Sequence, residues 1–191
     1  MYYVLCVIKP EGYGEGWMDI EDWTGIEGFG DWGIGALAEQ RPAGPVQINA
    51  VPHDGYQDDP ADLQDKTVPL MSKRLKEAMD AAGVDNINYL PITLKNTETG
   101  QVYDYFAFNL LGLVAAADPA KSKMSSHDGD FVGDSQIEDL VIDESKAGGL
   151  LIFRLKEKFS AILVHEKVRQ AIKSAGIKTV GFMRPEDFVA F

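Results

Sequence analysis

Residues 69–91 read PLMSKRLKEAMDAAGVDNINYLP, and residues 162–184 read ILVHEKVRQAIKSAGIKTVGFMR, at a constant offset of 93. Four aligned positions are identical: Leu70 and Leu163, Ala78 and Ala171, Ala82 and Ala175, and Gly83 and Gly176. Six further aligned pairs keep their apolar character, whereas the polar positions drift: Met71 and Val164, Leu75 and Val168, Met79 and Ile172, Val84 and Ile177, Ile87 and Val180, and Tyr89 and Phe182. This pattern indicates a structural template that occurs twice in the chain.

Each copy predicts a short strand, an amphipathic helix and a second strand. The apolar positions 71, 75, 78 and 82, and likewise 164, 168, 171 and 175, follow the i, i+4, i+7, i+11 spacing of a helix face turned toward a core. Ser72 is placed to cap the first helix, and Gly83 and Gly176 suit left-handed helix ends. His165 occupies the second cap position, where histidine is a poor capping residue.

The rest of the chain adds strands and loops around these two units. A hairpin is expected where NTETG joins two apolar runs. We expect residues 113–117 to extend the sheet of that hairpin, residues 53–65 to form an acid-rich loop, and residues 34–40 to form a short helical turn. The expected strands cover residues 2–8, 46–51, 87–95, 101–110, 137–143 and 150–155.

The predicted fold class is α+β, with two related strand-helix-strand units packed on a mostly antiparallel or mixed sheet. An irregular, acidic segment rich in glycine and tryptophan precedes them. We divide the chain into an acidic N-terminal region, residues 1–66, and an α+β region with the internal repeat, residues 67–191. The boundary is a soft one, because the two regions can share a sheet.

Charge is distributed unevenly along the 191 residues. The net charge is −12, and residues 10–65 hold 13 acids against the single base Arg41, whereas the rest of the chain holds 17 acids and 17 bases. A negative field of this kind repels nucleic acid and anionic membranes and speeds the approach of a basic partner. A solvated acidic face that only aids solubility is the other interpretation. The single Cys6 lies in an apolar opening without a targeting leader, so we predict a cytoplasmic protein.

The acidic field includes the stretch EGYGEGWMDIEDWTGIEGFGDWGIG, residues 11–35, which holds all three tryptophans and no Lys or Arg. Two interpretations stay open for the tryptophans: they anchor a partner protein, or they pack inward and brace a glycine-rich loop. If they are anchors, the surrounding carboxylates supply steering and specificity. The predicted partner-binding residues are Trp17, Asp19, Glu21, Asp22, Trp23, Glu27, Asp31 and Trp32.

Motifs for catalysis, cofactors or metals are weak. His53, His127 and His165 lack the spacing of a zinc site, and no nucleophile elbow or phosphate-binding loop occurs in a suitable context. We therefore predict no cofactor, no metal and no enzymatic activity. A metal-assisted hydrolase that uses clustered carboxylates is the enzyme alternative, and a generic acidic mimic of nucleic acid is a further one.

Three segments carry a family resemblance: PLMSKRLKEAMDAAGVDNINYLPITL, YFAFNLLGLVAAADPAKS, and IFRLKEKFSAILVHEKVRQAIKSAGIKTVGFMRPEDF. Over residues 70–94, 105–122 and 152–188 the chain resembles family eleven of the immunity proteins in bacterial polymorphic-toxin systems, previously a domain of unknown function. Two features depart from the family pattern: His165 stands in place of a small cap residue, and Leu110-Leu111-Gly112 replaces a basic position. The acidic tryptophan segment lies outside these three segments.

The resemblance implies a small bacterial protein that binds one cognate toxin and blocks it, without catalysis of its own. Many toxin domains attack nucleic acid and are basic, so an acidic face suits such a partner. The expected partner is therefore a basic toxin protein, with no nucleic acid and no membrane as partners.

Overall fold

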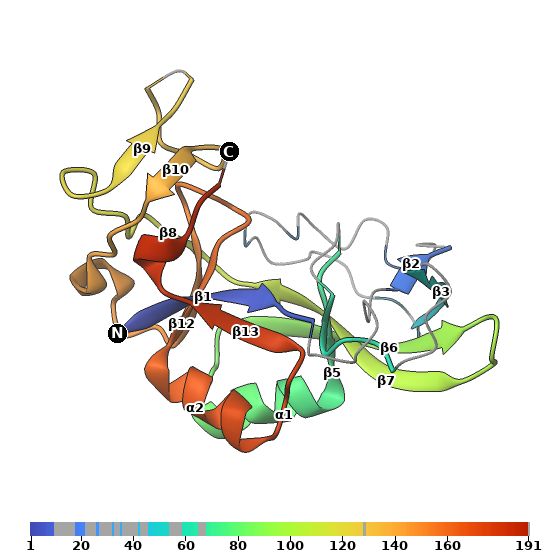
Figure 1. Ribbon diagram of the computed structural model, residues 1–191. Helices are drawn as coiled ribbons and strands as arrows, with labels where there is room; N and C mark the ends of the chain where they lie inside the picture. The colour runs from blue at the N-terminus through green and yellow to red at the C-terminus, as the bar shows by residue number, and fades with distance from the viewer. Residues whose placement is uncertain are drawn as a thin grey trace.

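The computed structural model describes residues 1–9, 18–21, 26, 32, 35, 42, 46–53, 59–64, 68–127 and 129–190. Two mixed β-sheets and two α-helices form the frame of this part of the chain (Figure 1). The predicted α+β class is confirmed. The helical turn predicted over residues 34–40 lies outside the described residues, apart from residue 35. None of the helices in the described ranges is long and apolar enough to cross a bilayer.

The first sheet has five strands in the order β13-β1-β12-β11-β8. Neighbouring strands are antiparallel, except that β8 runs parallel to β11. The strands are β1 (Tyr2–Val7), β8 (Leu113–Val114), β11 (Ile152–Leu155), β12 (Ile162–His165) and β13 (Val180–Met183). The expectation that residues 113–117 extend the hairpin's sheet is wrong. Gly112, with a φ of 85°, turns the chain after the hairpin, and β8 then pairs with β11 instead.

The second sheet has six strands in the order β2-β3-β6-β7-β5-β4. Its strands are β2 (Met18–Ile20), β3 (Val46–Pro52), β4 (Leu63–Gln64), β5 (Leu70–Ser72), β6 (Ile87–Asn96) and β7 (Val102–Leu110). β6 and β7 form the predicted antiparallel hairpin, and β3 runs parallel to β6. Residues 53–65 were predicted to form a loop throughout, but they contain β4, because Leu63 and Gln64 pair with the first two residues of β5.

Strands from the predicted N-terminal region belong to both sheets. β1 pairs with β12 and β13, β3 pairs with β6, and β4 pairs with β5. The described parts of residues 1–66 and 67–191 therefore share their hydrogen-bonded sheets. The boundary at residue 66 marks a change in composition and charge, and its role as a domain boundary stays a prediction.

The two helices, α1 (Lys73–Ala82) and α2 (Glu166–Ser174), begin at the predicted caps. The Oγ of Ser72 accepts a hydrogen bond from the Leu75 N–H at 3.2 Å, and the Nδ1 of His165 accepts one from the Lys167 N–H at 3.3 Å. Gly83, with a φ of 85°, ends α1 in the left-handed conformation. The second helix ends one residue earlier than the repeat predicts, so Ala175 is an exposed C-cap instead of a core residue.

In both strand-helix-strand segments, the strand before the helix and the strand after it lie in one sheet with a third strand between them. β7 separates β5 from β6, and β1 separates β12 from β13, each through antiparallel pairing. The flanking strands of each unit are consequently parallel to each other. Figure 1 shows α1 and α2 side by side.

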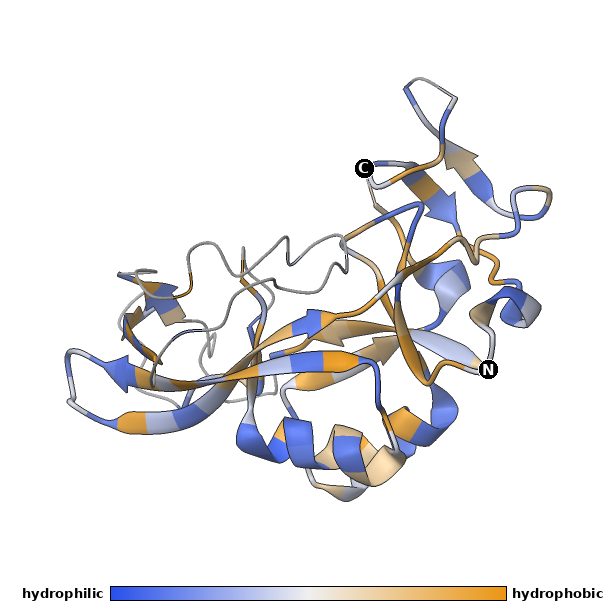
Figure 2. Cartoon of the chain, turned by 180° about the vertical axis from the view of Figure 1, so that it is seen from behind, coloured by the Kyte–Doolittle hydropathy of each residue, from blue (hydrophilic) through white to orange (hydrophobic). Residues whose placement is uncertain are grey.

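The core has three parts. The first lies between the helices and both sheets and contains Leu75 and Met79 of α1 together with Val168 and Ile172 of α2. The second covers the other face of the six-stranded sheet, where Ile48 is fully buried, and the third covers the other face of the five-stranded sheet. Figure 2 shows the hydrophobic residues concentrated along the strands and polar residues along the helices. The shared first core joins the two units into one packed body.

The segment between β8 and β11 lies over the third core. It contains the small antiparallel sheet of β9 (Lys123–Ser125) and β10 (Gln136–Asp139), followed by the 3-10 helix η2 (Glu144–Ala147). Residue Ala190 bridges to Ile137 of β10, so the end of the chain lies beside this small sheet (Figure 1).

Candidate functional site

Three of the predicted partner-binding residues, Asp19, Glu21 and Trp32, belong to the described part of the chain. Asp19 lies in β2, an outer strand of the six-stranded sheet, and Glu21 directly follows that strand. The other five predicted residues, Trp17, Asp22, Trp23, Glu27 and Asp31, lie outside the described residues. The described ranges therefore locate one acidic edge of the predicted surface.

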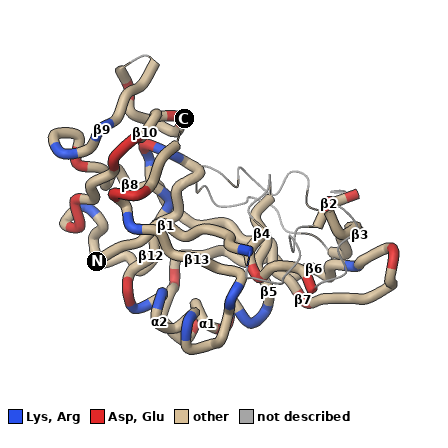
Figure 3. The backbone as a smooth tube through the Cα atoms, in the orientation of Figure 1, with Lys and Arg blue, Asp and Glu red and all other residues tan. Residues whose placement is uncertain are grey.

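Both carboxylates are exposed and held in place. The Oδ2 atom of Asp19 is 2.8 Å from the Nδ1 atom of His53, and the Oε2 atom of Glu21 accepts a hydrogen bond from the Thr97 hydroxyl at 3.0 Å. The Glu21 N–H donates to the carbonyl of Asn49 at 2.9 Å, which fixes the backbone as well. Acidic residues occur at β2 and at the tip of the β6–β7 hairpin (Figure 3). A positively charged group that approaches this edge meets carboxylates whose positions are already set.

Trp32 is half-buried and packs against the second core. This packing favours the bracing interpretation for Trp32.

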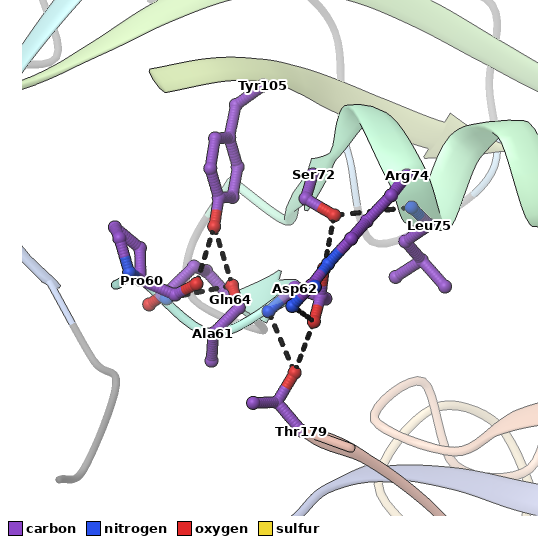
Figure 4. Close-up of polar contacts among 9 residues, drawn as sticks. All are labelled: Pro60, Ala61, Asp62, Gln64, Ser72, Arg74, Leu75, Tyr105 and Thr179. Carbon is purple, nitrogen blue, oxygen red and sulfur yellow. Dashed lines mark hydrogen bonds and ion pairs between the residues drawn. The ribbon is translucent and has the colours of Figure 1, made fainter. Parts of the chain in front are cut away.

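A second polar site surrounds Asp62. This residue was predicted only to belong to the acid-rich loop of residues 53–65. Asp62 is 1% exposed and accepts hydrogen bonds from three side chains: Ser72, Arg74 and Thr179 (Figure 4). The Arg74 guanidinium contacts it at 2.5 and 2.7 Å, one distance for each carboxylate oxygen. Burial alone raises the pKa of Asp62, but the hydrogen bonds from Arg74, Ser72 and Thr179 outweigh burial and lower it overall.

This cluster fixes elements that are distant in the chain. The Asp62 N–H donates to the Thr179 hydroxyl at 3.0 Å, and the Ser72 N–H donates to the Asp62 carbonyl at 2.8 Å. Asp62 and Thr179 are 117 residues apart. No local sequence pattern predicts a contact over this distance. The predicted helix cap, Ser72, is one of the residues that contact Asp62.

An open cleft of about 500 Å³ lies next to the Asp62 cluster. Its walls come from the start of α1, the first residues of β7 and the segment before β4. Tyr105 closes one side, because its hydroxyl donates to the carbonyls of Pro60 and Ala61 at 3.0 and 2.8 Å. Burial and the nearby carboxylate of Asp59 raise the pKa of Tyr103, which also lines the cleft.

A second hollow, of about 600 Å³, lies beside the chain's N-terminus. It is lined by Tyr2, by Leu140 and Ile142, and by the carboxylates of Glu144 and Glu186. The N-terminal amine forms an exposed ion pair with Glu144 at 2.8 Å. The Tyr2 hydroxyl donates to the carbonyl of Leu150, so this buried tyrosine already has a partner.

Within the described ranges, no group of three or more His, Cys, Asp or Glu side chains is close enough to hold a metal ion. His165 caps α2 and His53 lies against Asp19, so these two histidines contribute to separate parts of the fold.

The fold and these surfaces define a class: a small α+β protein with fixed acidic side chains on an outer strand and an open cleft beside a sheet edge. The sequence profile of the Immunity protein family (Imm11) matches residues 25–187. The chain belongs to this immunity protein family. A comparison with curated proteins gives no match.

The family match extends further toward the N-terminus than the three resembling segments do. It begins at residue 25, so Glu27, Asp31 and Trp32 lie within it, whereas the acidic residues of β2 precede it. The expectation that the whole acidic tryptophan segment lies outside the family pattern is therefore wrong. Part of that segment belongs to the family's matched region even though it carries no motif recognisable by eye.

Proposed function

We propose that this protein is an immunity protein that binds and neutralises a cognate toxin in the bacterial cytoplasm, without catalysis of its own. The observation that carries the proposal is membership of the Imm11 immunity protein family. The concentration of negative charge in residues 10–65 supports a basic toxin as the partner.

We place the contact surface on the acidic N-terminal segment, with Asp19 and Glu21 at its described edge. Their hydrogen bonds to His53 and Thr97 limit the motion of both carboxylates before binding, so less conformational freedom is lost when a partner binds. Asp22, Glu27 and Asp31 complete the acidic part of the proposed surface. Trp17, Trp23 and the exposed part of Trp32 are its proposed aromatic anchors.

The two strand-helix-strand units supply the frame in this proposal. β2 pairs with β3, and β3 pairs with β6 of the first unit, whose core is shared with the second unit. We infer that the two units are copies of one template and that the irregular acidic segment is held on this frame. A rigid frame favours a preformed binding surface.

The experiment compares two double variants of equal net charge against a catalytically inactivated toxin encoded beside this chain. Asp19→Lys/Glu21→Lys reverses the charge at the proposed surface, whereas Asp85→Lys/Asp187→Lys reverses two exposed acids elsewhere. We expect the first variant to weaken binding by about 10- to 100-fold at low salt, and the second by less than about threefold. Titration calorimetry measures both dissociation constants.

Equal losses of toxin affinity in the two variants would show that affinity depends on the net charge of the protein and not on contacts at Asp19 and Glu21. Equally strong binding of the unaltered chain to unrelated basic proteins would favour the generic acidic mimic over a cognate immunity protein.

A further inference from the structure

The outer edge of β7 is only partly used by its own sheet. β5 pairs with Tyr105, Phe106 and Ala107 and then ends at Ser72, where the chain turns into α1. The first residues of β7 therefore extend past the end of β5. No strand pairs with the outer side of residues 102–104 within the described ranges.

The hydrogen-bond pattern shows which backbone groups face this open edge. The Gln101 carbonyl accepts from the Asn96 N–H of β6, so odd-numbered residues of β7 turn their backbone groups toward β6. The Phe108 N–H donates to the Pro69 carbonyl on the opposite side, so even-numbered residues turn toward β5. By the alternation of an antiparallel strand, the N–H and C=O groups of Val102 and Asp104 point away from β6 at the open edge.

The open edge borders the 500 Å³ cleft described above. Gln101 to Tyr105 form one wall of the cleft, and Lys73, Arg74 and Glu77 at the start of α1 form the facing wall. Val102 and Asp104, whose backbone groups point away from β6, therefore line the cleft. Natural sheets usually cover or blunt such an edge, because it can pair with another chain.

The side chains at this edge suit a basic, extended segment. Val102 is 55% exposed, and Asp104 is exposed as well. The acids Asp59, Asp62, Glu77 and Asp104 outnumber the bases Lys73 and Arg74 in the lining. Asp62 and Arg74 are paired with each other, which leaves Asp59, Glu77 and Asp104 against Lys73 in the lining.

We propose that the open edge of β7 at Val102 and Asp104 binds an extended segment of the toxin as an added β-strand, with a basic side chain of that segment next to Asp104. Main-chain hydrogen bonds to an unpaired edge give affinity, and the alternate side chains give specificity. This inference rests on the proposed immunity function and adds a second contact, on the side of the hairpin opposite β3 and β2.

Hydrogen exchange on the unaltered chain tests the proposal directly. In the free protein the amides of Val102 and Asp104 should exchange quickly, whereas those of Tyr103 and Tyr105, which face β6, should exchange slowly. In the complex with the inactivated toxin, the amides of Val102 and Asp104 should slow by at least about tenfold.

A matched pair of variants gives a second readout. Val102→Pro removes the outward N–H but no hydrogen bond to β6, and proline is tolerated at sheet edges of this kind. It should weaken toxin binding at least about tenfold, whereas Val102→Ala, which keeps the N–H, should weaken it by less than about threefold. Thermal unfolding checks that both variants fold, and if Val102→Pro does not fold, the exchange measurement decides alone.

The outcomes separate this inference from the proposed function. A complex in which both amides exchange as quickly as in the free protein would overturn the added strand and leave the immunity function standing. The absence of any complex with the toxin would overturn both.

Discussion

Asp62 connects three elements that come from different parts of the chain: β4, the start of α1 and the segment before β13. A buried carboxylate is tolerated when its charge is balanced and its oxygens are hydrogen-bonded. Arg74 supplies the charge, and Ser72 and Thr179 supply further hydrogen bonds. The side chain therefore joins the end of the six-stranded sheet to the C-terminal unit.

Asp62→Asn should destabilise the protein by about 2–4 kcal/mol, because it removes the charge that Arg74 pairs with and leaves a buried amide poorly matched to three donors. Asp80→Asn breaks the exposed pair with Lys76 and should cost less than about 1 kcal/mol. Urea unfolding at pH 7 measures both changes, and similar losses in the two variants would contradict the role given to Asp62.

The effect of Asp62 should also depend on pH. Its folded-state pKa is lowered relative to the unfolded chain, so the ionised group stabilises the fold above about pH 4, the ordinary value for Asp. This contribution is lost as the pH falls through the lowered folded-state pKa. The stability gap between wild type and Asp62→Asn should therefore be constant from pH 7 to about pH 5 and shrink steadily below pH 4. A gap that is unchanged at pH 3 would contradict the assignment.

Single residues were predictable from sequence where their role is local. The caps at Ser72 and His165 and the left-handed glycines follow from neighbours within a few positions. The role of Asp62 depends on Thr179, which is 117 residues away. A contact over this separation produces no characteristic residue spacing in the sequence.

At the scale of elements, the two helices differ in how well their first turns are capped. Ser72 accepts from the Leu75 N–H and also donates to Asp62 at 2.6 Å, whereas His165 makes only a longer contact to the Lys167 N–H at 3.3 Å. Ser72→Ala should cost about 1–2 kcal/mol, and His165→Ala less than about 1 kcal/mol. Urea unfolding of both variants measures the difference, and a larger loss at His165 would show that the histidine cap is the stronger one.

Each helix also places a basic side chain over an aromatic ring of the strand that follows it. Lys76 lies 4.7 Å from the centre of the Tyr89 ring, and Arg169 lies 5.9 Å from that of Phe182. Arg169 follows Lys76 by 93 residues, and Phe182 follows Tyr89 by the same offset. A cation above an aromatic ring thus recurs in the two units, which supports the prediction of a duplicated template.

Local patterns also predicted the strands of the hairpin, because its turn and its apolar runs are adjacent in sequence. The sheet that β8 joins was predicted wrongly, because its partner β11 begins almost 40 residues later. We attribute this pairing to packing against the third core, which Val114 of β8 contacts.

At the scale of the whole molecule, strands from residues 1–66 belong to the same two sheets as the strands next to α1 and α2. Residues 1–66 supply β1 to the five-stranded sheet and β2, β3 and β4 to the six-stranded sheet. The acidic edge at β2 is thereby attached through β3 and β6 to the core shared by both helices. Composition located the charge in the chain, and the pairing of β2 with β3 places Asp19 and Glu21 at an outer strand of the six-stranded sheet.

The central claim is that this member of the Imm11 family binds one basic toxin through its acidic surface. Calorimetric titration of the protein into the catalytically inactivated toxin encoded beside it, at low and at physiological salt, tests that claim most directly. We predict a saturable 1:1 complex whose affinity falls as salt rises, because opposite charges contribute to the association. The absence of a complex at either salt concentration would contradict the account.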